Sequence, residues 1–174
     1  RDRFDIWCCF DYTHFGEEDF AEKACAELQR MHDLGAVGVG ELGDKGLGDT
    51  YARPVPGNGI HIDNPALRPL LAKAAELNMP VSIHIAEPYW MYLPMDEKND
   101  GLMNGASWHV DTSVEGCLDY DELMTSFENA VRDNPNTVFI ACHYLNMSQD
   151  YPRLSEMMEG CYGIDNLGRF TAVL

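Results

Sequence analysis

The sequence has few basic residues for its length. Only 12 lysines and arginines stand against 29 aspartates and glutamates over 174 residues, which gives a formal net charge of -17 at pH 7. A surface with this charge repels the phosphate backbone of nucleic acids and anionic lipid headgroups. We therefore expect neither nucleic acid nor a membrane surface as a partner.

Long apolar runs are also absent. No run approaches the roughly 20 residues that a helix needs to cross a bilayer. No basic segment followed by an apolar one marks a secretory signal at the N-terminus. The sequence therefore predicts no membrane partner, and the cytoplasm is the default expectation for its location.

Two common site motifs are missing. No C-x-x-C pair occurs, so a zinc site built on thiolates is not expected. The glycine-rich segment at residues 38–48 (GVGELGDKGLG) has neither the GxGxxG order that leads into a helix nor the GxxxxGK[ST] order, which argues against nucleotide binding. The cysteines lack the spacing of a disulfide framework, and we expect all six to be reduced: Cys8, Cys9, Cys25, Cys117, Cys142 and Cys161.

The sequence does contain an alternation of short strand-like runs with longer helical ones. Hydrophobic residues make up 45% of the chain, enough for a sizeable core. The alternation predicts an α/β fold of repeated βα units with a parallel sheet, in one domain over residues 1–174. The predicted strands cover residues 5–11, 36–42, 81–86, 137–144 and 161–166, and the predicted helices cover residues 17–34, 65–78, 119–132 and 151–159.

Five consecutive βα units fit either a doubly wound open sheet or part of a (β/α)8 barrel. In a barrel enzyme, the catalytic side chains lie at the carboxyl ends of several different strands. Glu41, His84 and His143 all fall near the carboxyl ends of predicted strands. The sequence therefore favours a partial (β/α)8 TIM barrel.

Period-two alternation predicts the direction of these three side chains. His84 is expected to face the barrel interior, opposite an apolar face that packs under the helices (Val81, Ile83 and Ile85). The same rule places His143 inside, on one face with Phe139 and Ala141. It also places Glu41 inside, on one face with Val37 and Val39.

A carboxylate and two imidazoles at neighbouring strand ends form a ligand set that zinc, manganese or iron accept. Burying a lone carboxylate is costly unless it is paired or binds a metal. We therefore predict a divalent metal, with zinc favoured, held by Glu41, His84 and His143. A bound divalent ion lowers the pKa of its water to about 7, so hydrolysis of a small-molecule substrate is the expected chemistry.

Other interpretations remain for these residues. A histidine at a strand end can simply form hydrogen bonds, which would make the chain a metal-free binding module. Glu41 can pair with Lys45 in a tight turn, and Lys45 can also be compared with a carbamylated bridging lysine, although it lies beyond the predicted strand. The remaining histidines show no comparable pattern and are expected to face solvent or cap local structure: His14, His32, His61 and His109.

Two connections are too long to be plain links, at residues 43–62 and 87–118. Trp90 and Tyr92 follow the strand that carries His84. A loop over a barrel mouth would place these two aromatic side chains on the wall of a substrate pocket. The alternative is a loop that packs on a small core of its own.

Several segments resemble the amidohydrolase superfamily of metal-dependent hydrolases. MPVSIHIAEP (residues 79–88) resembles its fifth-strand segment, which carries a metal-binding histidine, and NTVFIACHYLN (136–146) resembles its sixth-strand segment. GAVGVGELGDKG (35–46) is similar to its fourth strand, and also to the Glu-bearing strand of TatD-type deoxyribonucleases. The resemblance implies about five βα units, strands three to seven of the parent barrel, from CCFD (8–11) to YGIDNLGRF (162–170).

The sequence also departs from this superfamily. Its members carry an HxH pair on the first strand and a metal-binding aspartate on the eighth, whereas no HxH occurs here and Asp165 falls on the predicted seventh strand. A complete barrel typically needs about 250 residues. The resemblance thus implies an incomplete barrel without strands one, two and eight.

The superfamily includes hydrolases, decarboxylases and a hydratase that act on small carboxylated or aromatic substrates. The resemblance implies that His143 is a catalytic residue that binds the metal or polarises a substrate oxygen. The main expectation is a metal-dependent hydrolase of a small molecule, and the alternative is a metal-dependent decarboxylase of a small aromatic or unsaturated carboxylic acid. The acidic net charge disfavours a nuclease.

Overall fold

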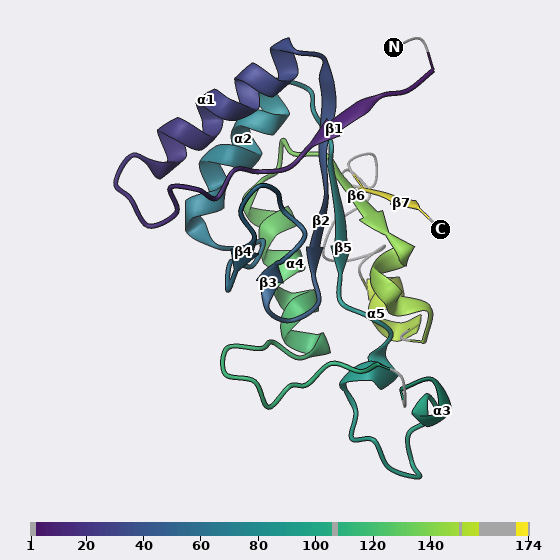
Figure 1. Cartoon of the computed structure of the whole chain (residues 1–174). Coiled ribbons are helices and arrows are strands. Elements are labelled where there is room, and N and C mark those ends of the chain that lie inside the picture. The colour runs from purple at the N-terminus through teal and green to yellow at the C-terminus, as the bar shows by residue number, and fades with distance from the viewer. Residues whose placement is uncertain (1–2, 106–107, 150, 157–169, 174) are drawn as a thin grey trace.

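The computed structural model describes residues 3–105, 108–149, 151–156 and 170–173 of the chain. It has a mixed α/β fold in which helices cover one face of a sheet (Figure 1). The covering helices are α1 (Phe20–Asp33), α2 (Arg68–Glu76) and α4 (Tyr120–Asp133). The helix α5 (Tyr151–Glu156) lies beyond the end of the strand that precedes it (Figure 1). The expected alternation of strands and helices is therefore confirmed.

Five strands of the sheet run parallel, each next to the one before it in the chain. They are β1 (Ile6–Cys8), β2 (Ala36–Asp44), β5 (Val81–Ile85), β6 (Phe139–Cys142) and β7 (Phe170–Val173). The two-residue strands β3 (Gly48–Asp49) and β4 (Gly57–Asn58) extend the end of β2 in antiparallel pairing. This sequential order leaves the carboxyl ends of β2, β5 and β6 side by side.

The helix boundaries follow from local sequence signals. In α1, Phe20, Ala24 and Leu28 form a buried stripe at helical spacing. Gly35 follows this helix at φ +100°, and its N–H donates to His32 O. The helix begins at Phe20 rather than at residue 17, because the preceding residues form turns.

The other covering helices begin at side-chain caps. Asn64 accepts a hydrogen bond from Ala66 N, and a 3-10 turn, η1 (Pro65–Leu67), then leads into α2. Asp119 and Glu122 form a reciprocal capping box at the start of α4. These caps satisfy backbone N–H groups that would otherwise have no partner within the helix.

The apolar face of β5 lies under the helices. Val81, Ile83 and Ile85 are at most 2% exposed, while Ser82 and His84 on the opposite face are partly exposed. The predicted alternation of this strand is confirmed. His84 therefore points to the face of the sheet opposite α1, α2 and α4.

The predicted alternation of β6 is wrong. Phe139 pairs with Val81, and its ring packs edge-on against Phe127 of α4 at a centroid distance of 5.7 Å. Phe139 and Ala141 thus face the helices rather than the open side of the sheet. The strand also begins two residues later and ends two residues earlier than predicted.

The predicted alternation of β2 is also wrong. Val39 is fully buried and pairs with Val81, so it faces the helices, whereas Val37 is 42% exposed. The register then shifts: Val39 pairs with Val81 and Leu42 with Ile83, so β2 has one extra residue between these two pairs. This bulge turns Glu41 away from the face of Val39.

The connections contain more structure than expected. Residues 87–118 include the 3-10 turn η2 (Tyr89–Tyr92) and the short helix α3 (Leu102–Gly105). The predicted strand at residues 161–166, with Cys161 and Asp165, lies outside the described residues. None of the helices in the described part of the chain is long and apolar enough to cross a membrane. The five described cysteines are unpaired thiols.

Candidate metal centre

Three side chains from neighbouring strand ends meet on the open face of the sheet. Glu41, His84 and His143 each offer one ligand atom, and these atoms lie within 4.8 Å of one another. Glu41 Oε1 lies 3.3 Å from His84 Nδ1, and the imidazole rings of His84 and His143 lie 4.9 Å apart between centroids. The structure thus brings together the residues singled out in the sequence.

The backbone turns left-handed after both histidine-bearing strands. Ala86 has φ +60°, and the residues from His143 to Asn146 all have φ between +50° and +54°. These four begin the 3-10 segment η3 (His143–Gln149). Such conformations cost about 1–2 kcal/mol for each residue other than glycine, and they cluster at functional sites. Asn146 Nδ2 donates to Ala86 O at 2.9 Å, which joins the two strand ends.

Glu87 and Lys45 form an ion pair beside His84. Lys45 Nζ lies 2.5 Å from Glu87 Oε1, and the same oxygen lies 3.5 Å from His84 Nε2. Lys45 therefore pairs with Glu87, and the predicted alternative of a Glu41–Lys45 pair is wrong. Within the described residues, His84 Nε2 is buried without a hydrogen bond.

Opposing effects set the ionisation of this group. The Glu87 carboxylate raises the pKa of His84 against the effect of burial. Burial acts to raise the pKa of Glu87, but His84 and Lys45 outweigh it and the net shift is downward. Burial acts to lower the pKa of Lys45, but Glu87 and Tyr51 reverse that effect and raise it.

A second pair of polar side chains lies next to the centre. Ser82 Oγ and Cys142 Sγ are 3.2 Å apart across β5 and β6. Burial raises the pKa of the Cys142 thiol, and the negative charge of Glu41 acts in the same direction. The Cys142 thiol is therefore neutral beside the centre.

Tyr51 forms a wall of the centre that the sequence reasoning missed. Its ring lies 6.4 Å from that of His84 in an edge-on arrangement. Gly43 pairs with His84 across the sheet, and a Cβ at Gly43 would lie 2.2 Å from the Tyr51 ring. A glycine inside a strand permits such a close approach, but the predicted strand ends at residue 42 and leaves Gly43 in the connection, so this signal was not used.

Trp90 packs within the long excursion, whereas Tyr92 joins the excursion to the end of β2 and to α4, where its ring packs against Tyr120. The Tyr92 hydroxyl accepts a hydrogen bond from Glu87 N and donates one to Lys45 O, at 3.0 and 3.1 Å. Trp90 lies over Gly101, where a Cβ would be 2.0 Å from the indole. The Trp90 contact fits the alternative of a self-packed loop, and a role of either residue in substrate binding stays a prediction.

A cavity of about 260 Å³ opens beside Lys45. Its walls combine Lys45 and Trp108 with the polar side chains of His109 and Asp111 and with small or apolar side chains of the two long connections. Lys45 Nζ lies 4.8 Å from the Trp108 ring centroid and 5.4 Å from that of Tyr51. The cavity thus places a cation, Lys45, beside an aromatic surface. Lys45 also contacts Glu87 of the candidate centre.

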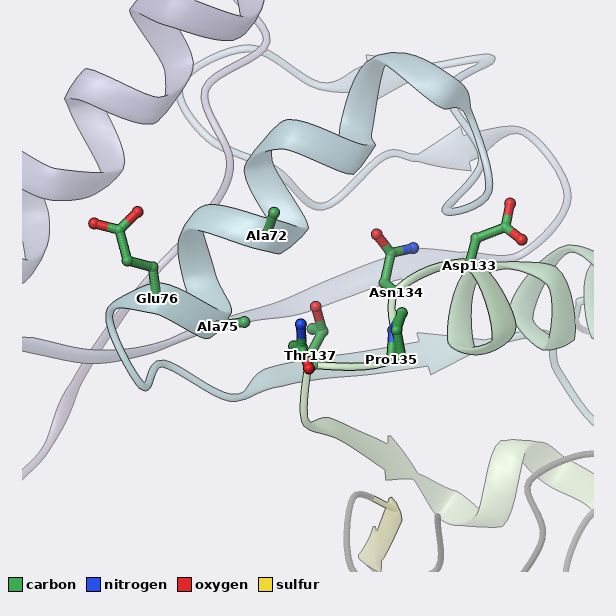
Figure 2. Close-up of a pocket in the computed structure, with 8 residues that line it drawn as sticks. Ala72, Ala75, Glu76, Asp133, Asn134, Pro135 and Thr137 are labelled. Atoms are coloured by element: carbon green, nitrogen blue, oxygen red, sulfur yellow. The ribbon is translucent and has the colours of Figure 1, made fainter. Parts of the chain in front are cut away.

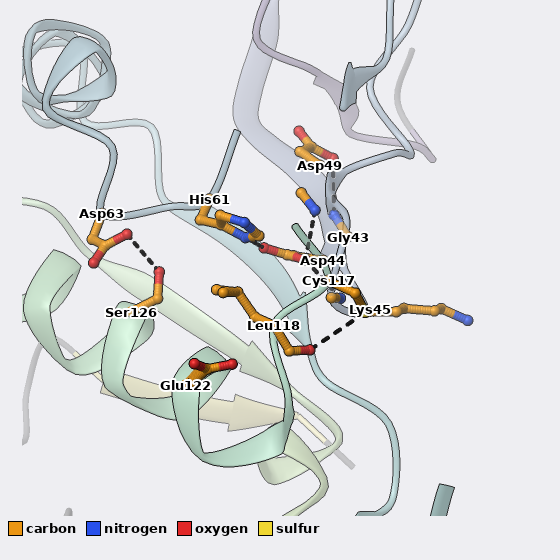
Figure 3. Close-up of polar contacts among 12 residues, drawn as sticks. Gly43, Asp44, Lys45, Asp49, His61, Asp63, Cys117, Leu118, Glu122 and Ser126 are labelled. Carbon is orange, nitrogen blue, oxygen red and sulfur yellow. Dashed lines mark hydrogen bonds and ion pairs between the residues drawn. The ribbon is translucent and has the colours of Figure 1, made fainter. Parts of the chain in front are cut away.

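His61 is not a solvent-facing residue or a local cap, so this prediction is wrong. Its Nδ1 lies 2.6 Å from Asp44 Oδ2, and the two side chains are 18% and 4% exposed (Figure 3). Asp44 Oδ1 also accepts hydrogen bonds from Gly46 N and Gly48 N. This pair fixes the turn that carries Lys45. Of the other histidines, His14 and His32 contact nearby acidic residues, and His109 is exposed.

A larger hollow of about 440 Å³ lies between the C-terminal ends of α2 and α4 (Figure 2). Its lining includes Glu76, Asp133 and Thr137. These residues come just before β5 or β6, whereas His84 and His143 lie at the opposite ends of the two strands. The hollow is therefore separate from the candidate centre.

No protein-family model matches the chain, and no curated protein matches it. Among solved structures, 2,6-dihydroxybenzoate decarboxylase complexed with 2,6-dihydroxybenzoate is similar, with a TM-score of 0.50 and 20% identity over 92% of this chain. The same enzyme from Rhizobium gives a TM-score of 0.49 and 21% identity over 87% of this chain. The likeness concerns the fold. The chain spans 44% and 42% of these two structures, less than half of their length.

Proposed function

We propose that this chain forms the catalytic part of a metal-dependent enzyme of the amidohydrolase superfamily that acts on a small molecule. One observation carries the proposal: Glu41, His84 and His143 converge within 4.8 Å at the ends of neighbouring parallel strands. The sequential strand order and the likeness to a decarboxylase fold support an arc of a (β/α)8 barrel. In that fold, active sites lie at the carboxyl ends of the strands, where these three residues are found.

The donor set fits a divalent transition metal. Two imidazoles and one carboxylate suit zinc, manganese or iron, and a carboxylate 3.3 Å from an imidazole nitrogen leaves both groups poised to share a cation. Glu41, His84 and His143 would hold the ion. When bound, it would supply Lewis-acid polarisation of a substrate oxygen and acidify a bound water.

For the reaction, we favour decarboxylation of a small aromatic or unsaturated carboxylic acid. The support is the fold of 2,6-dihydroxybenzoate decarboxylase, together with the cavity beside Lys45, where an aromatic wall and a cation lie together. Hydrolysis of a small ester or amide is the second candidate, because the same ligand set can activate water. Both reactions use the same three residues.

In decarboxylation, the ring carbon that loses carbon dioxide must gain a proton. His143 is the exposed imidazole of the centre, and its ring lies next to that of His84, whose side chain is 13% exposed. As a ligand of the ion, His143 keeps one ring N–H free, and we assign that N–H to a hydrogen bond with a substrate oxygen, while solvent supplies the proton. The Tyr51 ring would exclude water from one side, and Trp90 and Tyr92 would shape the excursion that closes over the centre.

The metal centre can be tested by titrating the purified chain with Co²⁺ and following its visible absorption. We expect one bound ion per chain and a loss of affinity of at least tenfold in His84→Ala and in His143→Ala, since each change removes one ligand. His32→Ala is the matched control, because His32 lies on α1 next to Asp33. Equal binding by the two variants and the control would overturn the proposed centre.

The reaction can be tested by supplying the metal-loaded chain with 2,6-dihydroxybenzoate and measuring carbon dioxide release. A parallel assay measures hydrolysis of a small aryl ester. Carbon dioxide release that depends on His143 supports the decarboxylase, whereas ester hydrolysis alone supports the hydrolase.

A further inference from the structure

We propose that Glu87 is a positioning residue for the candidate metal centre. In this role the Glu87 carboxylate accepts a hydrogen bond from His84 Nε2–H when the present 3.5 Å approach shortens, which leaves His84 Nδ1 as the nitrogen that binds a cation. The inference rests on the proposed metal centre, and it assigns a role to a residue outside the group of Glu41, His84 and His143.

The two ring nitrogens of His84 face two different carboxylates. Nδ1 lies 3.3 Å from Glu41 Oε1, on the side of the other ligand atoms, and Nε2 lies 3.5 Å from Glu87 Oε1. Nε2 is buried, and no described residue forms a hydrogen bond with it. A buried ring nitrogen without a partner is costly, and a shortening of the Glu87 contact by a few tenths of an ångström would satisfy it.

A histidine that binds a metal commonly donates its other N–H to a carboxylate. Such a contact fixes the tautomer and the ring orientation, and it increases the basicity of the ligating nitrogen. Glu87 is well placed for this role, since its side chain is only 13% exposed, as is that of His84. It follows His84 by three residues, on the segment that leaves β5.

Glu87 is itself held from two directions. Lys45 Nζ lies 2.5 Å from Glu87 Oε1, and Glu87 N donates to the Tyr92 hydroxyl, which in turn donates to Lys45 O. Lys45 also compensates the charge of this largely buried carboxylate in a chain with a net charge of -17. The β2 turn and the excursion after β5 are therefore joined around this carboxylate.

The first test compares Co²⁺ affinity in the intact chain, its Glu87→Gln variant and a Glu97→Gln control. Glu97 is an exposed residue of the same excursion, so the control loses the same charge. Loss of a carboxylate that supports a metal-binding histidine typically weakens binding about 10–100-fold. We expect that loss in Glu87→Gln, an unchanged Co²⁺ absorption spectrum at saturation, and no loss in the control.

A changed spectrum at saturation would make Glu87 a direct ligand and overturn the positioning role, as would equal affinity in all three proteins. Circular dichroism of each variant checks that it is folded. In a second variant, Lys45→Met, the Glu87 side chain remains but loses its ion pair with Lys45. We expect this variant to lose less Co²⁺ affinity than Glu87→Gln.

The second test needs no metal. Long-range ¹H–¹⁵N correlation spectra of the metal-free chain, at a pH where the His84 imidazole is neutral, report which nitrogen carries the proton. We expect the Nε2–H tautomer in the wild-type chain and a mixture of both tautomers in Glu87→Met. The Nδ1–H tautomer in the wild-type chain would overturn the inference. If the wild-type chain has the Nε2–H tautomer but binds no Co²⁺, the proposed function fails while the Glu87–His84 contact stands.

Discussion

The buried pair of Asp44 and His61 stabilises the turn after β2 that carries Lys45. Asp44 is 3% exposed at the end of β2, where it accepts hydrogen bonds from two backbone amides and faces the His61 imidazole. The hydrogen bond to Asp44 raises the pKa of His61, although burial acts against it. The protonated imidazole therefore stabilises the folded chain.

This pair predicts a pH-dependent contribution to stability. Because the pKa of His61 is raised on folding, its contribution is fully present below the unfolded value of about 6.5 and is lost as the pH rises through the folded value. We expect His61→Gln to lower the free energy of unfolding by about 1–3 kcal/mol at pH 6, and by less as the pH rises. Urea unfolding of both proteins from pH 5.5 to 9 measures the difference.

His32→Gln serves as the control for His61, since the His32 side chain is 40% exposed on α1. A gap between wild type and His61→Gln that widens toward high pH would contradict the assigned pairing.

At this scale, the sequence predicted part of the candidate centre. His84 was placed correctly because β5 is regular, so alternation gives its direction. Tyr51 and His61 were missed because each contacts a partner that is distant in the chain. Glu87 was missed because it lies beyond the regular part of β5, where alternation no longer predicts direction. The close approach of Gly43 to Tyr51 became visible only in the structure, where β2 extends to Asp44.

Backbone irregularities within β2 and directly after β6 determine the direction of the Glu41 and His143 side chains. Val39 and Phe139 face the helices, so regular strands would send Glu41 and His143 to the same side. The β2 bulge and the left-handed conformation of His143 turn them to the open face instead. The sequence reasoning reached the correct face for both residues from a wrong assignment of the strand faces, since neither irregularity has a clear pattern in the sequence.

The elements themselves were largely predictable. Apolar periodicity and the caps located α1, α2 and α4 within a few residues, because local interactions decide where a helix begins and ends. The short strands β3 and β4 were missed, because they depend on Asp44 and Asp49 contacts within the loop rather than on an apolar pattern.

The capping box of α4 makes a prediction for this helix. In Asp119→Ala, the N–H of Glu122 loses its acceptor, and we expect the free energy of unfolding to fall by about 1 kcal/mol. Glu115→Ala, at an exposed residue before the helix, removes the same charge without a cap. Urea denaturation compares the two variants, and an equal loss in both would contradict the capping role.

For the whole molecule, the net charge of -17 opposes compaction through self-repulsion. Raising the salt concentration from about 10 mM to about 100 mM shortens the screening length from about 30 to about 10 Å. We therefore expect Tm to rise by a few degrees, measured by circular dichroism. The titration uses sodium chloride, and choline chloride at equal ionic strength is the control that separates screening from binding of small cations. A fall in Tm in both salts would contradict the prediction.

The β2 bulge and the left-handed end of β6 also bear on any attempt to transplant this centre. A designer who copied the residue types of Glu41, His84 and His143 to the same positions of three regular parallel strands would keep only the middle one in place, and the flanking two would turn into the hydrophobic layer. A successful graft must therefore include the extra residue of β2 and the segment after β6, because the irregular backbone at these two places determines where the ligand side chains lie.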